Sequence, residues 1–203
     1  MTDDELLALW RNGDADAASQ LFERHFDALY RFFRNKAPSF ADDLVQKTLL
    51  ACFEGRDRFR GESRFRTYLF GIARNQLLMW FAEHRGDAES SDRRESLADL
   101  DPSPSVVEEV RQEQQLILQA LRRLPLDAQV LLELFYWEQL SGPELAEVLG
   151  VPEGTIRSRL RRARQLLGES IAELEREPSR LASTLSNLDD WASKLRAELS
   201  RPR

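Results

Sequence analysis

The clearest chemical feature of the sequence is a run of arginines within residues 157–164. The run contains no acidic residue, and its arginines are Arg157, Arg159, Arg161, Arg162 and Arg164. An arginine fork can bond O6 and N7 of guanine in the major groove of DNA. The run therefore predicts a DNA-binding surface, provided that a helix holds several of these side chains on one outer face.

The residues around the run predict a helix–turn–helix over residues 140–164. Ser141 and Glu144 have the spacing of a capping box, Gly150 suits a left-handed helix end, and Pro152 suits the first turn of a second helix. That second helix should turn Ile156, Leu160, Ala163 and Leu167 inward, and Arg157, Ser158, Arg161, Arg162 and Arg164 outward. A helix–turn–helix places its second helix in the major groove. The simpler alternative is a helical hairpin with a solvated basic face.

The composition excludes several other classes of protein. The chain has 203 residues, of which 42% are hydrophobic, and one cysteine (Cys52) and two histidines (His25 and His84). These residues cannot form an internal disulfide or a zinc site, so we expect neither a metal nor another cofactor. No apolar run approaches the ~20 residues of a spanning helix, and the start of the chain is not basic. We therefore expect a cytoplasmic protein without membrane insertion.

The negative charge is concentrated in one segment. Residues 87–109 contain eight acidic and two basic residues, a net charge of −6 that equals the net charge of the whole chain. The remainder is balanced, with basic clusters at residues 56–74 and 157–164. Weak net attraction to phosphate predicts that the free chain binds DNA poorly, so a partner should deliver it to DNA.

Helical periodicity throughout the chain predicts an all-α protein of two small helical domains. In residues 1–86 we expect a helix that starts at a Thr2–Glu5 capping box, and further helices over residues 16–37, 40–54 (capped by Ser39) and 63–85. Residues 87–105 have the composition of an acidic linker. In residues 106–170 we expect helices to about residue 123 (capped by Ser105 with Glu108) and over residues 127–138, before the helix–turn–helix.

Residues 171–203 form a C-terminal extension with one apolar stripe, which predicts an amphipathic helix. The stripe consists of Leu181, Leu185, Leu188, Trp191, Leu195 and Leu199. It can be buried against the two domains or against a partner, and the sequence does not choose between these alternatives.

Four motifs in order give the chain a resemblance to a known family. They are DLVQ at residues 43–46, FRGES at 59–63, YLFGIARN at 68–75 and Leu-Pro at 124–125, before the helix–turn–helix. Residues 1–170 thus resemble regions 2 and 4 of the extracytoplasmic-function (ECF) sigma factors. The resemblance implies a dissociable promoter-specificity subunit of bacterial RNA polymerase that is not itself an enzyme. A helix–turn–helix repressor or activator is the alternative, but it would leave residues 43–46 and the helix over residues 63–85 without a role.

The resemblance assigns DNA contacts to both domains. Asn75 matches the position where similar sigma factors hold a flipped base of the −10 promoter element, and Arg60, Arg64, Arg66 and Arg74 accompany it. In the same helix we expect a buried stripe of Phe65, Leu69, Ile72, Gln76 and Trp80. We expect most of the aromatic residues Phe65, Tyr68, Phe70, Trp80 and Phe81 to pack in the core rather than on bases. The candidates for the −35 element are Thr155, Arg157, Ser158, Arg161 and Arg162, with Thr155 better placed for phosphate.

The resemblance also implies protein partners. The helix over residues 40–54 would dock on the β′ clamp of core RNA polymerase through Asp43, Leu44, Gln46 and Lys47, although Leu44, Leu50 and Phe53 could instead be core residues. Related proteins often carry an acid and an aromatic where this chain has Lys47 and Leu49. The resemblance further implies contact with the β flap of the polymerase, and an anti-sigma factor as a partner. The acidic linker either keeps the chain soluble and flexible or mimics a polyanion near the RNA path.

Overall fold

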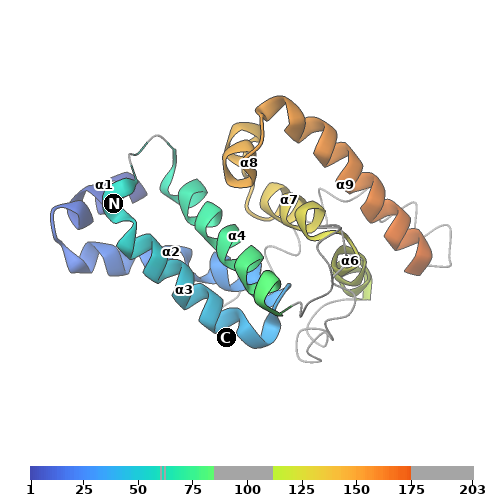
Figure 1. The fold of residues 1–203 in the computed structure, drawn as a ribbon, viewed down its shortest axis with the longest axis horizontal. Coiled ribbons are helices and arrows are strands. Elements are labelled where there is room, and N and C mark those ends of the chain that lie inside the picture. The colour runs from blue at the N-terminus through green and yellow to red at the C-terminus, as the bar shows by residue number, and fades with distance from the viewer. Residues whose placement is uncertain (60, 62, 85–111, 175–203) are drawn as a thin grey trace. The chain divides into compact units, whose positions relative to one another are not determined.

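A computed structural model describes residues 1–59, 61, 63–84 and 112–174 (Figure 1). These residues form α-helices and two short 3-10 helices, with no strand among them, which confirms the expected all-α class. The chain divides into two compact units, one made mostly of residues before position 88 and the other mostly of residues after it. We call them the N-terminal unit and the C-terminal unit. None of the helices in the described ranges combines the length and the apolar character needed to cross a bilayer.

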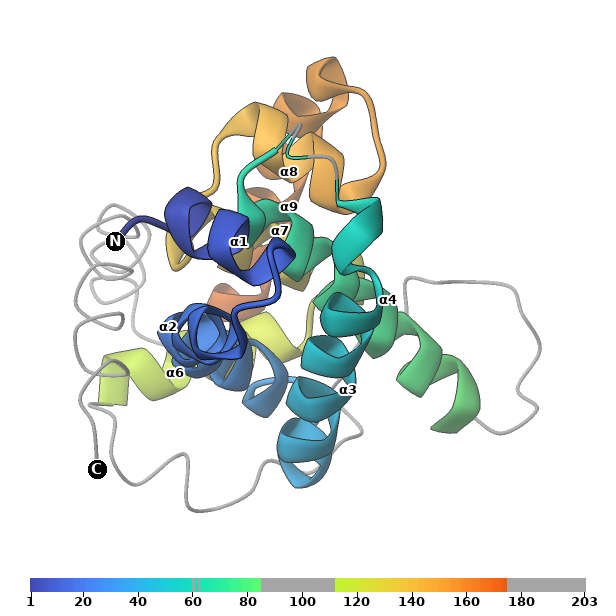
Figure 2. The same cartoon turned by 90° about the vertical axis from the view of Figure 1, so that its left-hand side faces the viewer.

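Among its described residues, the N-terminal unit contains four α-helices and two 3-10 helices. They are α1 (Asp3–Arg11), α2 (Ala15–Arg34), η1 (Pro38–Phe40), α3 (Ala41–Glu54), η2 (Arg56–Arg58) and α4 (Phe65–His84). Figures 1 and 2 show the α-helices from two sides. α1 packs on α2, and α3 packs on both α2 and α4. Their shared core includes Leu6, Leu21, Leu29, Phe33, Leu44, Cys52, Phe65, Leu69, Phe70 and Leu77, all of them buried.

The first helix begins as the sequence predicts. The hydroxyl of Thr2 accepts a hydrogen bond from the backbone N–H of Glu5, and the Glu5 carboxylate accepts one from the N–H of Thr2. This capping box satisfies two N–H groups that have no partner within the helix. α1 ends at Arg11, and Gly13 follows in the left-handed region with φ +96°.

The second and third helices differ in detail from the prediction. α2 starts at Ala15, because Asp14 accepts hydrogen bonds from the N–H groups of Asp16 and Ala17, and it ends before the turn that leads to Pro38. Ser39 does not cap α3, since it lies inside η1 and the position before α3 is Phe40. In α2, Phe26 is 42% exposed and its ring stacks on that of Tyr30.

α4 is buried on more than one side, so the single stripe expected for it is wrong. Its buried residues are Phe65, Thr67, Leu69, Phe70, Ala73, Leu77, Trp80 and Phe81, whereas Ile72 and Gln76 are only half-buried. Four of the five aromatic residues discussed above therefore pack in the core, as expected, and Tyr68 is half-buried.

The C-terminal unit contains α6 (Gln112–Arg122), α7 (Leu126–Tyr136), α8 (Gly142–Leu149) and α9 (Glu153–Leu174). α9 packs on α6 and α7, and the Ser170 hydroxyl donates a hydrogen bond of 3.1 Å to the backbone carbonyl of Ala120 in α6. The expected acidic linker over residues 87–105, the Ser105–Glu108 cap and most of the C-terminal extension lie outside the described residues. Only residues 171–174 of that extension are described, and they continue α9.

Candidate nucleic-acid interface

The turn between α8 and α9 fixes the start of the predicted recognition helix. Gly150 has φ +64°, its N–H donates to the carbonyl of Glu147, and the N–H of Val151 donates to the carbonyl of Ala146. This pair of bonds is a Schellman motif, which satisfies carbonyls at the end of α8. At the start of α8 the predicted capping box is half formed, because the Glu144 carboxylate accepts from the Ser141 N–H while the Ser141 hydroxyl donates to Glu144.

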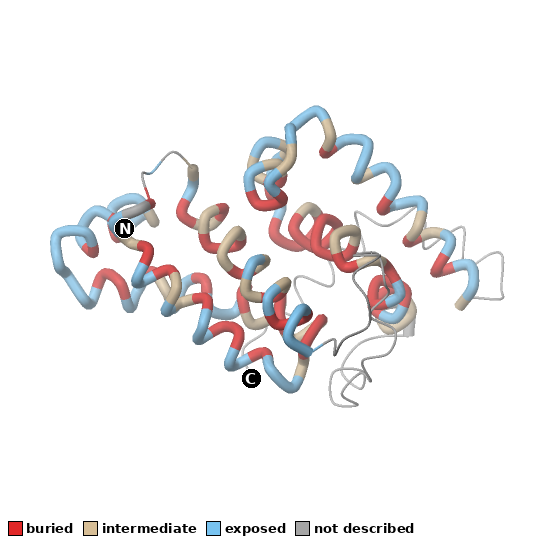
Figure 3. The backbone as a smooth tube through the Cα atoms, viewed as in Figure 1, coloured by how far each residue is buried: buried red, intermediate tan, exposed pale blue. Residues whose placement is uncertain are grey.

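Buried and exposed positions alternate along α9 (Figure 3), and the exposed positions include its arginines. Ile156, Ala163 and Leu167 are buried, and Leu160 is half-buried. The sequence-predicted contacts Arg157, Ser158, Arg161 and Arg162 are all exposed, and Thr155 is half-buried. The outer face therefore gathers four of the five proposed −35 residues over two turns of one helix.

The arginines of α9 differ in whether their side chains contact other residues of the chain. Arg157 and Arg161 form no ion pair with any residue that the structure describes, whereas Arg162 lies 4.0 Å from the Glu169 carboxylate. The guanidinium of Arg164 lies 5.2 Å from the ring centroid of Phe135 and 5.4 Å from that of Tyr136. Arg164 thus stacks on the end of α7, and the side chains of Arg157 and Arg161 remain available for a ligand.

The candidate residues on α4 lie closer to the core than those on α9. Asn75 and Arg64 are exposed, while Arg66 and Arg74 are half-buried, and the Arg66 guanidinium lies 5.8 Å from the Phe70 ring centroid. Arg60, the fifth candidate, lies outside the described residues. The exposed side of α4 thus carries the Asn75 amide and several arginines, and Arg66 among them lies against an aromatic residue of the core.

One exposed residue near Asn75 was not singled out from the sequence. Met79 is 56% exposed and follows Asn75 by one helical turn, so both side chains lie on one face of α4. The i, i+4 spacing from Asn75 is the sequence signal that could have placed Met79 on the same face of the helix.

The outer face of α3 carries three of the four residues predicted to contact polymerase. Asp43, Gln46 and Lys47 are exposed, and the Lys47 ammonium lies 2.9 Å from the Asp43 carboxylate. The hydrogen bond and charge of Asp43 raise the pKa of Lys47. Leu44, the fourth residue, is only 1% exposed, so its side chain belongs to the core and its assignment to the contact surface is wrong.

Two apolar side chains extend this face of α3. Leu50 is 56% exposed and Phe53 is 53% exposed, which settles the alternative that the sequence left open for these residues. Because Leu50 follows Lys47 by three positions and Phe53 follows Leu50 by three, helical spacing could have grouped them with Gln46 and Lys47.

Comparison with known proteins assigns both units. The Sigma-70 region 2 family matches residues 21–86, and the Sigma-70 region 4 family matches residues 114–167. The ECF RNA polymerase sigma-E factor of Haemophilus influenzae is 30% identical over 189 residues, which cover 86% of this chain and 97% of that protein. The ECF RNA polymerase sigma-E factor of Escherichia coli K12 is 27% identical over 186 residues, covering 87% of this chain and 97% of that protein.

Solved structures agree with these relatives. CnrH, in complex with the cytosolic domain of CnrY, has a TM-score of 0.63 and 25% identity, over 82% of this chain and 95% of that chain. The sigma factor RpoE of Bartonella quintana, in complex with the anti-sigma factor NepR, has a TM-score of 0.59 and 25% identity, over 78% of this chain and 98% of that chain. Since a relative at 30% identity is matched over 97% of its length and both family regions are found in order, the chain belongs to the ECF RNA polymerase sigma factors.

Proposed function

We propose that this sigma factor contacts the −35 promoter element through the outer face of α9. The observation that carries the proposal is the exposure of Arg157, Ser158, Arg161 and Arg162 on the second helix of a helix–turn–helix. Side chains on that face can reach base edges in the major groove. Thr155 is half-buried near the start of the helix, and we propose that it contacts the phosphate backbone.

The −10 element is the proposed ligand of α4. Exposed Asn75 can hydrogen-bond the edge of an unstacked base, and Arg64, Arg66 and Arg74 supply positive charge along the same helix. Arg60 is included on the family resemblance alone. Capture of an extruded base would stabilise the separated strands, so opening needs no hydrolysis step. The protein then directs initiation by binding and is not itself an enzyme.

The outer face of α3 is the proposed docking surface for the β′ clamp of core RNA polymerase. Asp43, Gln46 and Lys47 supply polar contacts there, and exposed Leu50 and Phe53 add apolar area. The C-terminal unit would contact the β flap. Both contacts require the cytoplasmic polymerase, so we place the protein in the cytoplasm with promoter DNA and core polymerase as its partners.

An anti-sigma factor is a further proposed partner. RpoE of Bartonella quintana, which is similar over 78% of this chain, was solved in complex with the anti-sigma factor NepR. We propose that an anti-sigma factor likewise controls this chain.

The proposed division of labour follows the predicted domain boundaries. Residues 1–86 act as region 2, residues 87–105 as the acidic linker and residues 106–170 as region 4. The extension over residues 171–203 has an apolar stripe in its sequence, and we propose that this stripe adds a second level of control over the two regions.

The substitution Asn75→Ala tests the assignment of α4. The variant is bound to core RNA polymerase and given a promoter that the wild-type complex selects from a randomised DNA library. We expect thymines of the −10 element to lose most of their permanganate reactivity while protection of the −35 element persists, because the amide acts only on separated strands. Asn12→Ala is the matched control, since Asn12 is exposed and uses its backbone N–H to end α1.

Two results would contradict the assignment. Unchanged permanganate reactivity of Asn75→Ala would show that this amide does not hold a base. Equal loss of upstream protection and of opening would show that the residue acts on polymerase binding or on the fold.

A further inference from the structure

The loop between α3 and α4 is anchored at its centre by a buried aromatic residue. The loop carries Arg56, Arg58, Arg60 and Arg64, and Phe59 stands among them with only 7% of its surface exposed. Arg56 before Phe59 and Arg64 after it can therefore be directed by the way in which Phe59 is held.

Arg11, at the end of α1, holds Phe59 from one side. Its Nη2 donates a hydrogen bond to the backbone carbonyl of Phe59, 48 residues further along the chain. The same guanidinium lies 5.6 Å from the centroid of the Phe59 ring. One side chain thus contacts both the backbone and the ring of the loop residue, as the planar guanidinium group allows.

α4 also holds Phe59. The Phe59 ring stacks on Tyr68 with centroids 4.5 Å apart and meets the Phe65 ring edge-on at 6.2 Å. The Tyr68 hydroxyl donates a hydrogen bond of 3.4 Å to the carbonyl of Gly55 at the start of the loop. A Cβ at Gly55 would lie 2.6 Å from that hydroxyl, so this position leaves no room for a side chain without moving Tyr68.

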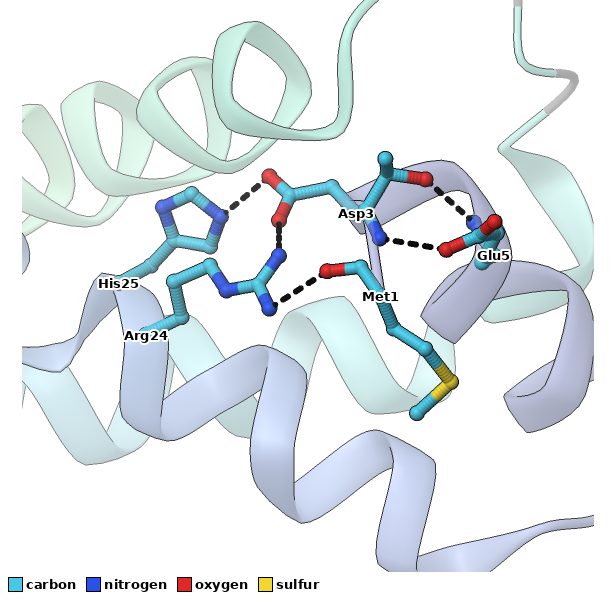
Figure 4. Close-up of polar contacts among 6 residues, drawn as sticks. Met1, Asp3, Glu5, Arg24 and His25 are labelled. Carbon is cyan, nitrogen blue, oxygen red and sulfur yellow. Dashed lines mark hydrogen bonds and ion pairs between the residues drawn. The ribbon is translucent and has the colours of Figure 1, made fainter.

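α1 can serve as a support because its other end is tied to α2 (Figure 4). The Asp3 carboxylate accepts hydrogen bonds from Arg24 at 2.6 Å and from the His25 ring at 2.7 Å, and Arg24 also donates to the carbonyl of Met1. Trp10, next to Arg11, is 2% exposed and packs against the ring of Phe53 in α3. The position of the Arg11 backbone is therefore fixed independently of the loop.

We propose that Arg11 is a positioning residue for promoter opening, which holds Phe59 and thereby directs the loop arginines that the structure describes, Arg56 and Arg64, toward the −10 element. The inference rests on the proposed role of α4. It extends that role to α1, which lies before the residues 21–86 matched by Sigma-70 region 2. Arg11 itself does not need to touch DNA.

A direct contact between Arg11 and a DNA phosphate is the competing explanation, because Arg11 is exposed on its outer side. The two explanations differ in what lysine can replace. Lysine keeps the charge that attracts phosphate, but it lacks the planar fork that can bond the Phe59 carbonyl and cover its ring at once.

The test measures Arg11→Lys and Phe59→Leu in the full chain bound to core RNA polymerase. The probe is a promoter selected from a randomised library by the wild-type complex. Closed-complex affinity is measured at low temperature, and the rate of opening by a permanganate time course. We expect each variant to open the promoter roughly tenfold more slowly with unchanged closed-complex affinity, the order of effect of one lost charged hydrogen bond. The double variant should open no more slowly than either single variant, because both remove the same contact.

Controls separate the possible failures. Arg34→Lys makes the same change on α2, and we expect it to open the promoter at the wild-type rate. Wild-type opening by Arg11→Lys would overturn the proposal, as would additive effects in the double variant. If Asn75→Ala opens normally while Arg11→Lys is slow, the −10 assignment of α4 fails although the loop contact matters. If Asn75→Ala is slow while Arg11→Lys is normal, only the role of Arg11 fails.

Discussion

The two helices that carry the proposed DNA contacts, α4 and α9, are built in opposite ways. α4 buries eight of its 20 residues and holds Arg66 and Arg74 half-buried, with the Arg66 guanidinium near the Phe70 ring. α9 buries five of its 22 residues and leaves Arg157 and Arg161 exposed. In α4 the proposed contact residues therefore lie among core residues. In α9 they lie on the face opposite the core.

This difference predicts a difference in function. The proposed −10 contacts of α4 would depend on how the N-terminal unit is packed, since the same turns hold core residues and proposed contact residues. The proposed −35 contacts of α9 would depend on individual side chains, which can change without disturbing the fold. Substitutions should therefore couple stability and activity in α4 and separate them in α9.

The largest expected effect is on the stability of the N-terminal unit. Phe70 is 1% exposed and meets the ring of Phe32 edge-on at 5.6 Å, so Phe70→Ala should lower the free energy of unfolding by about 3–5 kcal/mol. Urea unfolding of this unit, followed by fluorescence, measures the change. Met79→Ala, at an exposed position of the same helix, is the control. A loss below 1 kcal/mol for Phe70→Ala would remove the proposed contrast between the two helices.

An intermediate effect is expected on sequence preference at α9. Arg161→Ala should reduce discrimination at one base pair of the −35 element by about 1–3 kcal/mol, the contribution of a bidentate arginine–guanine pair. Selection of sites from a random library, with the variant bound to core polymerase, measures the preference. The free energy of unfolding should stay within about 0.5 kcal/mol of the wild type, because Arg161 is exposed. Weakened binding to all sequences alike would instead make Arg161 a phosphate contact.

The smallest expected effect is a pH dependence confined to the N-terminal unit. Burial lowers the pKa of His25 below its ordinary value, and the Asp3 carboxylate offsets only part of this shift. As the pH falls below about 6.5, the unfolded chain takes up a proton on this histidine before the folded chain does, so folding stability decreases.

His25→Gln should flatten this decrease between pH 6.5 and about 5, a window above the pKa of ordinary carboxyl groups. Urea unfolding at a series of pH values measures it. The C-terminal unit is an internal control, since both histidines of the chain precede it. An unchanged slope in the His25→Gln variant would assign the acid sensitivity to other groups.

Local signals in the sequence predicted the ends of several helices and the face of α9. The Thr2–Glu5 cap, the left-handed Gly150 and the exposed arginines each depend on residues within a few positions of one another. The predicted helix ends were less accurate where another part of the chain decides them. Ser39, for example, lies inside η1 and does not cap α3.

Apolar character alone could not predict which leucines lie on the outer face of α3, because apolar residues occupy almost every side of that helix. Leu44 and Leu50 are chemically identical, yet one is 1% exposed and the other 56% exposed, and only the packing of α2 and α4 separates them. The contact between Arg11 and Phe59 spans 48 positions and follows from where α1 lies in the fold. Periodicity within a helix contains no information about such a pair.

The burial of Cys52 has a practical consequence for labelling chemistry. This cysteine is the only one in the chain, it lies fully inside the core, and burial raises the pKa of its thiol to about 12. Thiol-reactive dyes attack through the thiolate, so they should leave the native residue unmodified near neutral pH. A cysteine introduced at an exposed position, such as Ser19 on α2, would then be the single reactive site for a fluorophore that follows promoter opening in real time.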